Sequence, residues 1–190
     1  YITNNDSLQK YGVDSNTMMT LIIPNSYLMW WNSPVKNILS RFADQRDKFW
    51  DGKRAAKATA MNLTPVQVYT MASIVEEETN KQEDKGLIAS VYMNRIKKGM
   101  KLEADPTVKY AMRNFSLKRI LHGHLQYPSP YNTYQNTGLP PGPIATPSIN
   151  TIDAVISFLQ GHNPTLSHLI CQEDFLPEAS RFEQLDDLDW

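Results

Sequence analysis

The stretch that decides the fold is LTPVQVYTMASIVEEETN, residues 63–80. Thr64 is a good helix N-cap, Pro65 occupies the first helical position, and Gln67 completes a capping box. Beyond the cap, apolar residues recur at helical spacing and form one stripe, which consists of Val68, Met71, Ala72 and Val75. The stretch therefore predicts a helix that packs one face on a core.

Three adjacent glutamates end this helix, and at about 100° per residue they face three directions. Glu77 points away from the apolar stripe and should be solvated. Glu76 and Glu78 lie on the two opposite edges of the stripe, where a core meets a surface or a cleft. Partial burial there raises the pKa of a carboxyl, which can then deliver a proton near neutral pH. A solvated acidic helix end is the alternative interpretation.

Composition narrows the class of function. The 190 residues include 19 basic and 20 acidic side chains, a net charge of −1, so nothing indicates a nucleic-acid partner. The single cysteine, Cys171, excludes an intrachain disulfide and a cysteine zinc cluster. No apolar run reaches the ~18 residues of a membrane span. The chain starts at Tyr1 without a signal peptide, so we interpret it as a fragment or processed form whose missing part could include an anchor.

The rest of the N-terminal half is also helical in pattern. Apolar periodicity and turn residues predict helices near 7–11, from 33–34 to a break at 51–52, and over 53–62, 63–80 and 84–98. Gly99 ends the last of these as a C′ residue. Residues 18–23 are apolar and compatible with a short strand, which a Pro-Asn turn ends.

From residue 100 onward the pattern changes. Residues 100–103 alternate like a short strand, 105–107 cap a helix over about 108–113, and 117–121 form a helical turn. Residues 126–148 make a long irregular stretch rich in proline and glycine, whose aromatic and asparagine content argues against disorder. A helix over 149–160, a strand at 168–171 and an acidic tail follow. We predict an α+β fold, with a helical N-terminal half and a second part of helices, short strands and a long Pro- and Gly-rich loop.

Three motifs, in this order and spacing, carry a resemblance to a known family. They are ASIVEEET (72–79), VYMNRIKKGMKLEADPT (91–107) and SPYNTYQNTGLPPGPIATP (129–147). Together they resemble the YceG-like family, the endolytic murein transglycosylases. The resemblance extends more weakly to IPNSY (23–27) and fades after about residue 160. It implies an N-terminal segment at 1–52, a catalytic domain at 53–175 that carries the three motifs, and an atypical acidic tail at 176–190.

The resemblance also implies a reaction. Such enzymes cleave peptidoglycan glycan strands internally at the MurNAc-GlcNAc bond and leave 1,6-anhydro-N-acetylmuramic acid ends, without a cofactor or a metal. Their catalytic acid is the first glutamate of the S-I-V-E-x-E-T run, here Glu76. Because the C6 hydroxyl of the sugar captures the anomeric carbon, one carboxyl can act first as acid and then as base. We expect an apolar surround to raise the pKa of Glu76 for the acid step.

The other candidate residues are expected to bind substrate: Glu78, Asn94, Arg95, Asp105, Thr107, Tyr131, Asn132, Thr133 and Tyr134. The YNTY run at 131–134 is the main candidate, because its amide and hydroxyl groups match sugar substituents and its rings can cover a pyranose. We expect this loop to form one wall of the cleft that contains Glu76.

Structural roles are the alternatives for several of these residues. Glu78 could instead pair with Arg95 or cap a loop, and Asp105 could act as a helix N-cap. Asn94 and Arg95 could tie two helices together, and the Asn-Thr pair of the YNTY run could form a plain turn. The sequence HGH at 122–124 could place two metal ligands on a strand, but its surroundings indicate a helix end instead.

The expected substrate is the glycan strand of peptidoglycan, with peptidoglycan synthases as further candidate partners. The parent protein is expected in the bacterial cell envelope, anchored in the cytoplasmic membrane by a segment absent here, with this domain on its outer side. Two other functions stay open: a catalytically silent glycan-binding module, and a hydrolase with Glu76 and Asp105 as a carboxylate pair. Carboxyls roughly 5–9.5 Å apart would favour the hydrolase.

Overall fold

The fold is known from a computed structural model, which describes residues 5–160. The helices are α1 (Asn5–Gln9), the 3₁₀ helix η1 (Met18–Leu21), α2 (Val35–Phe49), α3 (Lys53–Ala60), α4 (Pro65–Glu78), α5 (Gln82–Lys97), α6 (Asp105–Ala111), α7 (His122–Leu125) and α8 (Ile149–Gln160). The strand predicted at 168–171 and the acidic tail at 176–190 lie outside the described residues.

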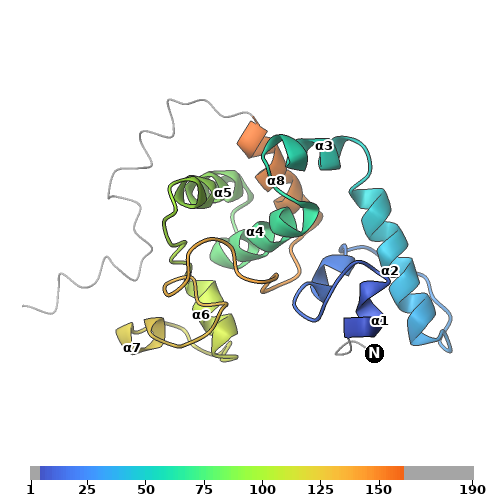
Figure 1. The fold of residues 1–190 in the computed structure, drawn as a ribbon, viewed down its shortest axis with the longest axis horizontal. Helices are drawn as coiled ribbons and strands as arrows, with labels where there is room; N and C mark the ends of the chain where they lie inside the picture. Colours follow the sequence, from blue (N-terminus) through green and yellow to red (C-terminus); the bar gives the residue numbers. More distant parts are fainter. Residues whose placement is uncertain (1–4, 161–190) are drawn as a thin grey trace, which may run out of the picture.

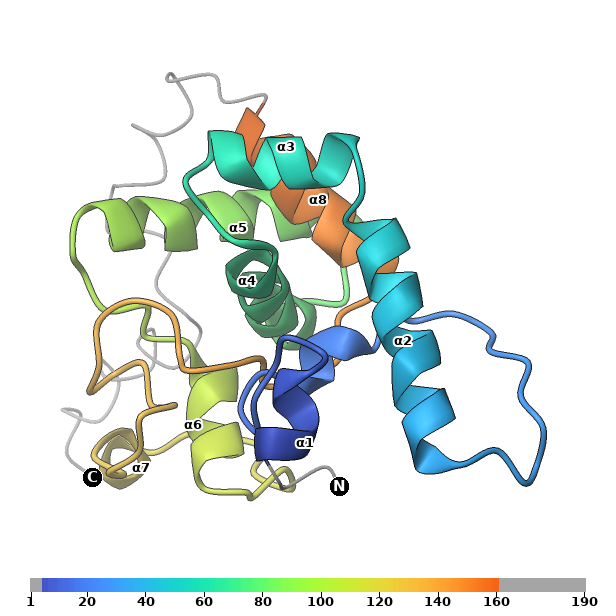
Figure 2. The ribbon, with the colours of Figure 1, turned by 45° about the vertical axis from the view of Figure 1, so that its right-hand side comes forward.

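Helix α4 is the centre of the molecule, with α3, α5 and α8 packed on one side of it and α6 on another (Figures 1 and 2). All eight residues from Val68 to Val75 are buried. The sequence predicted a single buried stripe, and this is wrong for the middle of the helix. A second covering comes from the irregular stretch after α7, which lies over the face that the wheel left open. Only the ends of α4 remain accessible.

Both ends of α4 follow their sequence signals. The backbone N–H of Thr64 donates to Oε1 of Gln67 at 2.8 Å, and the backbone N–H of Gln67 donates to Oγ1 of Thr64 at 3.2 Å. This is the predicted capping box, and Pro65 begins the helix as expected. Glu78 is the last helical residue, so the three glutamates form the final turn.

The strands predicted at 18–23 and 100–103 are not confirmed within residues 5–160. Among the described residues the pairing is limited to one isolated antiparallel bridge, between Lys101 and Thr137. Residues 18–21 form η1 instead of a strand, and Leu21 and Ile23 are buried without any strand beside them. An apolar run becomes a strand only where a neighbouring edge supplies hydrogen bonds, and helices occupy those positions here. The described fold is mostly helical.

The described residues form two apolar clusters. The larger surrounds α4 and includes residues of α3, α5 and α8. The smaller belongs to α1, η1 and α2, and its buried members are Leu8, Tyr11, Val13, Leu21, Leu39 and Ala43. Tyr69 of α4 joins them, because its hydroxyl donates to the carbonyl of Ile22 at 2.7 Å. The domain boundary predicted at residue 52 stays a prediction.

The irregular stretch from 126 to 148 is fastened at several points. The side-chain amide of Asn132 donates to the carbonyls of Leu125 and Tyr127, at 3.0 and 2.8 Å. Further along, Gly142 lies so close to Asn16 that a Cβ atom would overlap its carbonyl oxygen. The loop is therefore held against both the N-terminal segment and α4.

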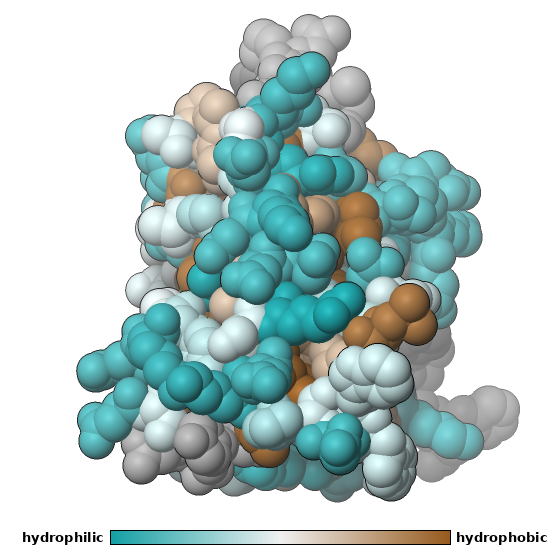
Figure 3. Space-filling view, turned by 90° about the vertical axis from the view of Figure 1, so that its right-hand side faces the viewer, coloured by the Kyte–Doolittle hydropathy of each residue, from teal (hydrophilic) through white to brown (hydrophobic). Residues whose placement is uncertain are grey.

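The surface beside α2 is mainly hydrophilic, with scattered apolar side chains (Figure 3). Large exposed apolar residues near the start of α2 are Leu28, Trp30, Trp31 and Val35. Over the described residues, no helix combines the length and the apolar character that crossing a membrane requires.

Candidate active site

The final turn of α4 presents its three glutamates as the helical wheel predicted. Glu77 is exposed, whereas Glu76 and Glu78 are each partly buried. The two edge residues face different neighbours: Glu76 faces α5 and α8, and Glu78 faces α5 and α6. The turn therefore carries two separate carboxyl environments.

Glu76 is held through one of its oxygens. Its Oε2 accepts hydrogen bonds from Nζ of Lys85 at 3.0 Å, from Oγ of Ser148 at 3.2 Å, and from Oγ1 of Thr151. Lys85 also donates to Oγ1 of Thr151 at 2.7 Å, and its side chain is only 7% exposed. We call Lys85, Ser148 and Thr151 the Glu76 clamp. Three segments far apart in the sequence thus converge on one carboxylate oxygen.

The clamp reverses the expected shift of the pKa. Burial by itself would raise the pKa of Glu76, but the hydrogen bonds from Thr151 and Lys85, together with the charge of Lys85, outweigh it. The pKa of Glu76 therefore lies below its usual value, and the carboxylate is the favoured form at neutral pH. The predicted apolar surround and raised pKa are wrong for the protein without substrate.

Glu78 shows the opposite shift. Burial is the main cause that raises its pKa, and the nearby charge of Asp105 adds to the effect. The hydroxyl of Tyr92 bonds to the carboxyl of Glu78, yet Oε2 of Glu78 is buried without a hydrogen-bond partner. Asp105 in turn accepts a hydrogen bond from the hydroxyl of Tyr134 at 2.7 Å. Glu78, Tyr92, Asp105 and Tyr134 are called the Glu78 cluster below.

The two polar residues of α5 that were expected near substrate have structural contacts. Arg95 forms an ion pair with Glu103 at 3.0 Å and donates to the carbonyl of Leu102 at 2.7 Å. The described ion pairs therefore do not join Arg95 to Glu78. Arg95 ties α5 to the segment that follows it, whereas the predicted tie between α5 and α4 stays a prediction. Asn94 is partly buried in the last turn of α5, where its carbonyl accepts the bond of the helix C-cap.

The central residues of the YNTY run lie inside the protein. Asn132 is completely buried and Thr133 almost so. The hydroxyls of Thr133 and Thr107 share a hydrogen bond of 2.8 Å, and Thr133 Oγ1 also accepts from the N–H of Ala104 at 3.0 Å. These side chains fix the loop to the start of α6. Their predicted contact with substrate stays a prediction.

The two tyrosines of the run are better placed at a surface. Tyr131 packs on Tyr110 with ring centroids 4.8 Å apart, and its hydroxyl donates to Oδ1 of Asn16 at 3.3 Å. Burial raises the pKa of Tyr131 to about 12. Tyr134 joins the Glu78 cluster, so the run lies on the Glu78 side of α4. The part of the loop that reaches Glu76 is Ser148, seventy-two residues along the chain from it.

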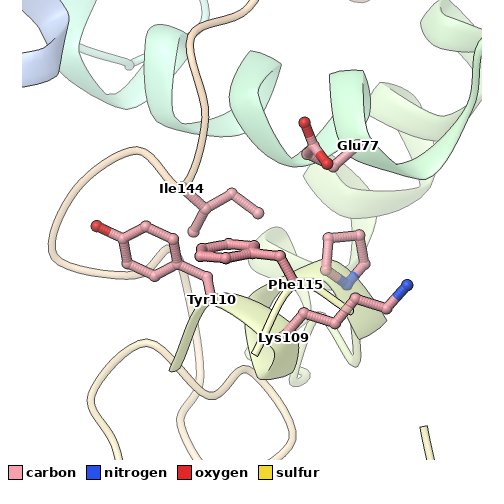
Figure 4. A pocket seen from close by; sticks show the side chains of 6 residues that line it. Glu77, Lys109, Tyr110, Phe115 and Ile144 are labelled. Carbon is pink, nitrogen blue, oxygen red and sulfur yellow. The ribbon is translucent and has the colours of Figure 1, made fainter. Parts of the chain in front are cut away.

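A pocket opens beside Glu77, between the final turn of α4 and α6 (Figure 4). The residues that line it are Glu77, Pro106, Lys109, Tyr110, Phe115 and Ile144, around a cavity of about 190 Å³. Ile144 comes from the long loop. Its backbone N–H donates to Oγ of Ser73 in α4 at 3.0 Å. The loop therefore forms one wall of a pocket next to the glutamate turn.

Sequence reasoning missed the three residues of the Glu76 clamp, although two of them left a signal. Lys85 shares a helix face with the apolar residues Ile88 and Tyr92, at spacings of three and seven. A lysine at such a position is buried only when it is paired, so it could have been identified as a partner of an acid. Thr151 similarly falls in register with Val155 on the buried side of α8. Ser148 gave no comparable signal.

Comparison with known proteins now adds to this geometry. The model of the YceG-like family matches residues 2–163, so the chain belongs to that family. It is 48% identical over 90 residues to the endolytic murein transglycosylase of Bacillus subtilis, a match that covers 47% of this chain and 25% of that protein. It is also 39% identical over 106 residues to the endolytic murein transglycosylase of Streptococcus pneumoniae, covering 54% of this chain and 19% of that protein.

A solved structure supports the fold. The chain resembles the crystal structure of a yceG-like protein from Listeria monocytogenes with a TM-score of 0.65 and 28% sequence identity. That match covers 80% of this chain and 53% of the Listeria chain. The chain thus spans a quarter or less of the curated relatives it matches and about half of the solved structure.

Proposed function

We propose that this chain cleaves peptidoglycan glycan strands internally, as a lytic transglycosylase in which Glu76 alone gives and takes the proton. The observation that best supports this role is the Glu76 clamp. Its three side-chain donors reach the same oxygen, Oε2, and so hold the carboxyl in one orientation. We assign the proton transfers to the other oxygen, Oε1. The names of the relatives support the substrate class.

The reaction follows from one carboxyl used twice. Protonated Glu76 gives its proton to the glycosidic oxygen, the bond between that oxygen and the anomeric carbon breaks, and the leaving sugar keeps the electron pair. The C6 hydroxyl of the muramic acid then bonds to the anomeric carbon, and its proton passes to the Glu76 carboxylate. The product has a 1,6-anhydro end, no water is consumed, and Glu76 is protonated again.

The lowered pKa of Glu76 favours the second proton transfer and disfavours the first. A stabilised carboxylate is a good acceptor for the second proton transfer but is seldom protonated for the first at neutral pH. A sugar that covers Oε1 excludes water, which disfavours the charged form and raises the pKa towards the value that the acid step needs. Substrate binding, in place of an apolar surround in the empty site, would then supply the shift.

The remaining candidate residues take supporting roles in this proposal. Asp105 and Tyr134 of the Glu78 cluster offer an acceptor and a ring to a neighbouring sugar, while Thr107, Asn132 and Thr133 hold the loop that presents them. Action in the cell envelope fits the relatives. Anchoring of the parent protein in the cytoplasmic membrane and contact with peptidoglycan synthases complete the proposal.

Mass spectrometry of digested glycan strands tests it. The parent chain should release fragments with 1,6-anhydro ends, and Glu76→Gln should release none. Fragments with reducing ends would instead identify a hydrolase, as expected if Glu76 and Asp105 act as a pair. Retained binding of strands without any cleavage would identify a glycan-binding module, and either result would overturn the proposal.

A further inference from the structure

The pocket beside Glu77 carries one negative and one positive side chain on otherwise uncharged walls. Glu77 lies at the edge nearest α4, and Lys109 extends from α6 below it (Figure 4). The cavity of about 190 Å³ is smaller than the ~300–1,000 Å³ of sites that enclose a whole small-molecule ligand. It therefore suits a branch of a substrate, since a whole disaccharide needs more room.

Both charges of the pocket are available to a ligand. The four ion pairs within residues 5–160 join Arg46 to Asp47, Arg54 to Asp153, Lys85 to Glu76, and Arg95 to Glu103. None of these uses Glu77 or Lys109. Glu77 is exposed and Lys109 partly exposed, so an oppositely charged group can reach each of them, although the charge of Lys109 also acts on the nearby Glu78 carboxyl.

The walls between the two charges are aromatic and aliphatic. Phe115 is 70% exposed and meets Tyr110 edge-on, with ring centroids 6.4 Å apart. Pro106 and Ile144 complete the surface. An exposed phenylalanine beside a carboxylate and an ammonium group is complementary to a ligand that carries an amine and a carboxylate on a short aliphatic frame. Neutral hydroxyl and acetamido groups of a bare sugar would leave both charges unused.

We propose that this pocket binds the peptide stem of the glycan strand, with a free amine of the stem against Glu77 and a carboxylate against Lys109. The inference rests on the proposed function. In peptidoglycan the stem hangs from N-acetylmuramic acid, the sugar whose anomeric carbon Glu76 is proposed to expose. Glu77 follows Glu76 directly in the final turn of α4, so the wall of the pocket begins one residue from the proposed catalytic carboxyl.

Stem recognition of this kind makes the chain selective for strands that still carry their peptides. Each ion pair with a partly exposed side chain contributes about 0.2–1 kcal/mol, or about 1.4- to fivefold in affinity. The two together separate stem-bearing from bare strands by about 2- to 25-fold. The selectivity requires no change at Glu76.

Calorimetric binding of four muropeptides tests the assignment of each charge. The probes are a disaccharide with a stem that has a free amine and a free C-terminal carboxylate, its N-acetylated form, its C-terminally amidated form, and the disaccharide without a stem. Glu77→Gln should weaken binding of the first probe by about two- to fivefold. This variant should also bind the N-acetylated probe as tightly as the first probe, because the group that recognises the amine is gone. Lys109→Met should give the same loss and should no longer respond to amidation.

Matched variants control for charge alone. Glu83→Gln and Lys118→Met remove exposed charges of the same two kinds outside the pocket and should bind all four probes like the parent. Equal binding of the stem-bearing and bare disaccharides by the parent would overturn the inference. The inference would also be overturned if Glu77→Gln and Lys109→Met lost the same affinity for the stem-bearing disaccharide as for the bare one, because that result would identify a sugar site. The proposed cleavage chemistry is tested separately by loss of anhydro ends in Glu76→Gln.

Discussion

The two sides of the final turn of α4 each carry a glutamate, and their surroundings shift its pKa in opposite directions. On one side the Glu76 clamp surrounds a carboxylate with an ammonium group and two hydroxyls, and the pKa falls. On the other side Glu78 is buried beside Tyr92 and near Asp105, and the pKa rises. Two residues of sequence separation are enough to shift the pKa of the same kind of side chain in opposite directions.

The difference teaches that partial burial alone does not decide the protonation state of an edge carboxyl. Both glutamates lose part of their hydration, but the ammonium group and hydroxyls around Glu76 outweigh that loss, whereas the single hydroxyl of Tyr92 does not outweigh the burial of Glu78. Pairs of acids whose pKa values are driven apart often divide acid and base roles between them. Glu78 is therefore the rival for the acid step, and the predictions below separate it from Glu76.

The largest expected effect is that of Glu76→Gln. If Glu76 is the proposed group that gives and takes the proton, its removal should lower the rate of strand cleavage by about 10³-fold, within the range that positioned acids and bases contribute. Glu78→Gln should lose less than about tenfold. Cleavage rates of purified strands, with circular dichroism to confirm folding, measure both. If Glu78→Gln were the inactive variant and Glu76→Gln the active one, the two roles would have to be exchanged.

Lys85→Met should change the pH dependence of cleavage. Lys85 lowers the pKa of Glu76, so its removal raises that pKa, and the protonated form persists to higher pH. The fall of kcat/KM with rising pH should therefore move to higher pH. The maximal rate should drop by about 10- to 100-fold, because the carboxyl loses one of its positioning contacts.

A matched lysine in the same helix serves as control for that profile. Lys81 is exposed at the N-cap of α5, one turn before the buried Lys85. Lys81→Met should leave the pH at which kcat/KM falls where it is in the parent. A profile that fails to move in Lys85→Met would contradict the electrostatic role of the clamp.

Glu78→Gln should raise stability, and only above acidic pH. The folded pKa of Glu78 is raised above the ordinary value of 4.5, so the folded protein binds the Glu78 proton more tightly than the unfolded chain does. The resulting stability is fully present below pH 4.5 and is lost as pH rises through the folded pKa. Glutamine cannot ionise, so the variant does not suffer this loss. At pH 7 the variant should melt roughly 2–4 °C above the parent, the shift that ~1 kcal/mol gives in a domain of this size. At pH 4 the two melting temperatures should agree. A lower melting temperature at pH 7 would show that the cluster stabilises the charged form.

The smallest effect is expected at the N-terminal end of α4, whose cap supports the helix that carries both Glu76 and Glu78. Thr64→Ala removes the N-cap and should lower the free energy of unfolding by about 0.5–1 kcal/mol at every pH. Chemical denaturation at pH 4 and pH 7 measures it. Thr59→Ala, an exposed threonine of α3, is the comparison that keeps the capping box intact. Dependence of the Thr64→Ala effect on pH would mean that the cap is coupled to one of the two glutamates.

The sequence predicts best where the physics is local. The capping box of α4, the stop at Gly99 with its φ of 67°, and the outward direction of Glu77 each depend on residues within one or two turns. Most helices begin and end within a few residues of the predicted positions. The strands expected at 18–23 and 100–103 are not confirmed in the described residues, because strand-like composition is not enough: only the arrangement of the whole chain decides whether a partner strand exists.

The sequence identifies single candidate residues, whose roles stay predictions, but not the contacts that surround them. The wheel singled out Glu76 and Glu78, but it could not contain Thr151, which is 75 residues away in the chain, nor the effect of Lys85 on the pKa. Asn132 and Thr133 carry polar groups of the kind that bind sugars, yet these groups already bond to the backbone of Leu125, Tyr127 and Ala104. A residue type indicates what a side chain can bind, and the tertiary contacts decide what it does bind.

The convergence of distant segments on α4 has a consequence for how fast the chain folds. Side-chain contacts join residues 115, 99 and 75 positions apart, through Asn16, Arg54 and Glu76 respectively. Helical proteins with mainly local contacts fold in microseconds to milliseconds, whereas long-range closure slows folding. During synthesis at about 5–20 residues per second, α4 emerges roughly 4–15 s before the threonine that completes its clamp. For that interval the side of α4 that α8 covers has no partner in the part of the chain already made, although α3 and α5 are available to pack on other parts of α4.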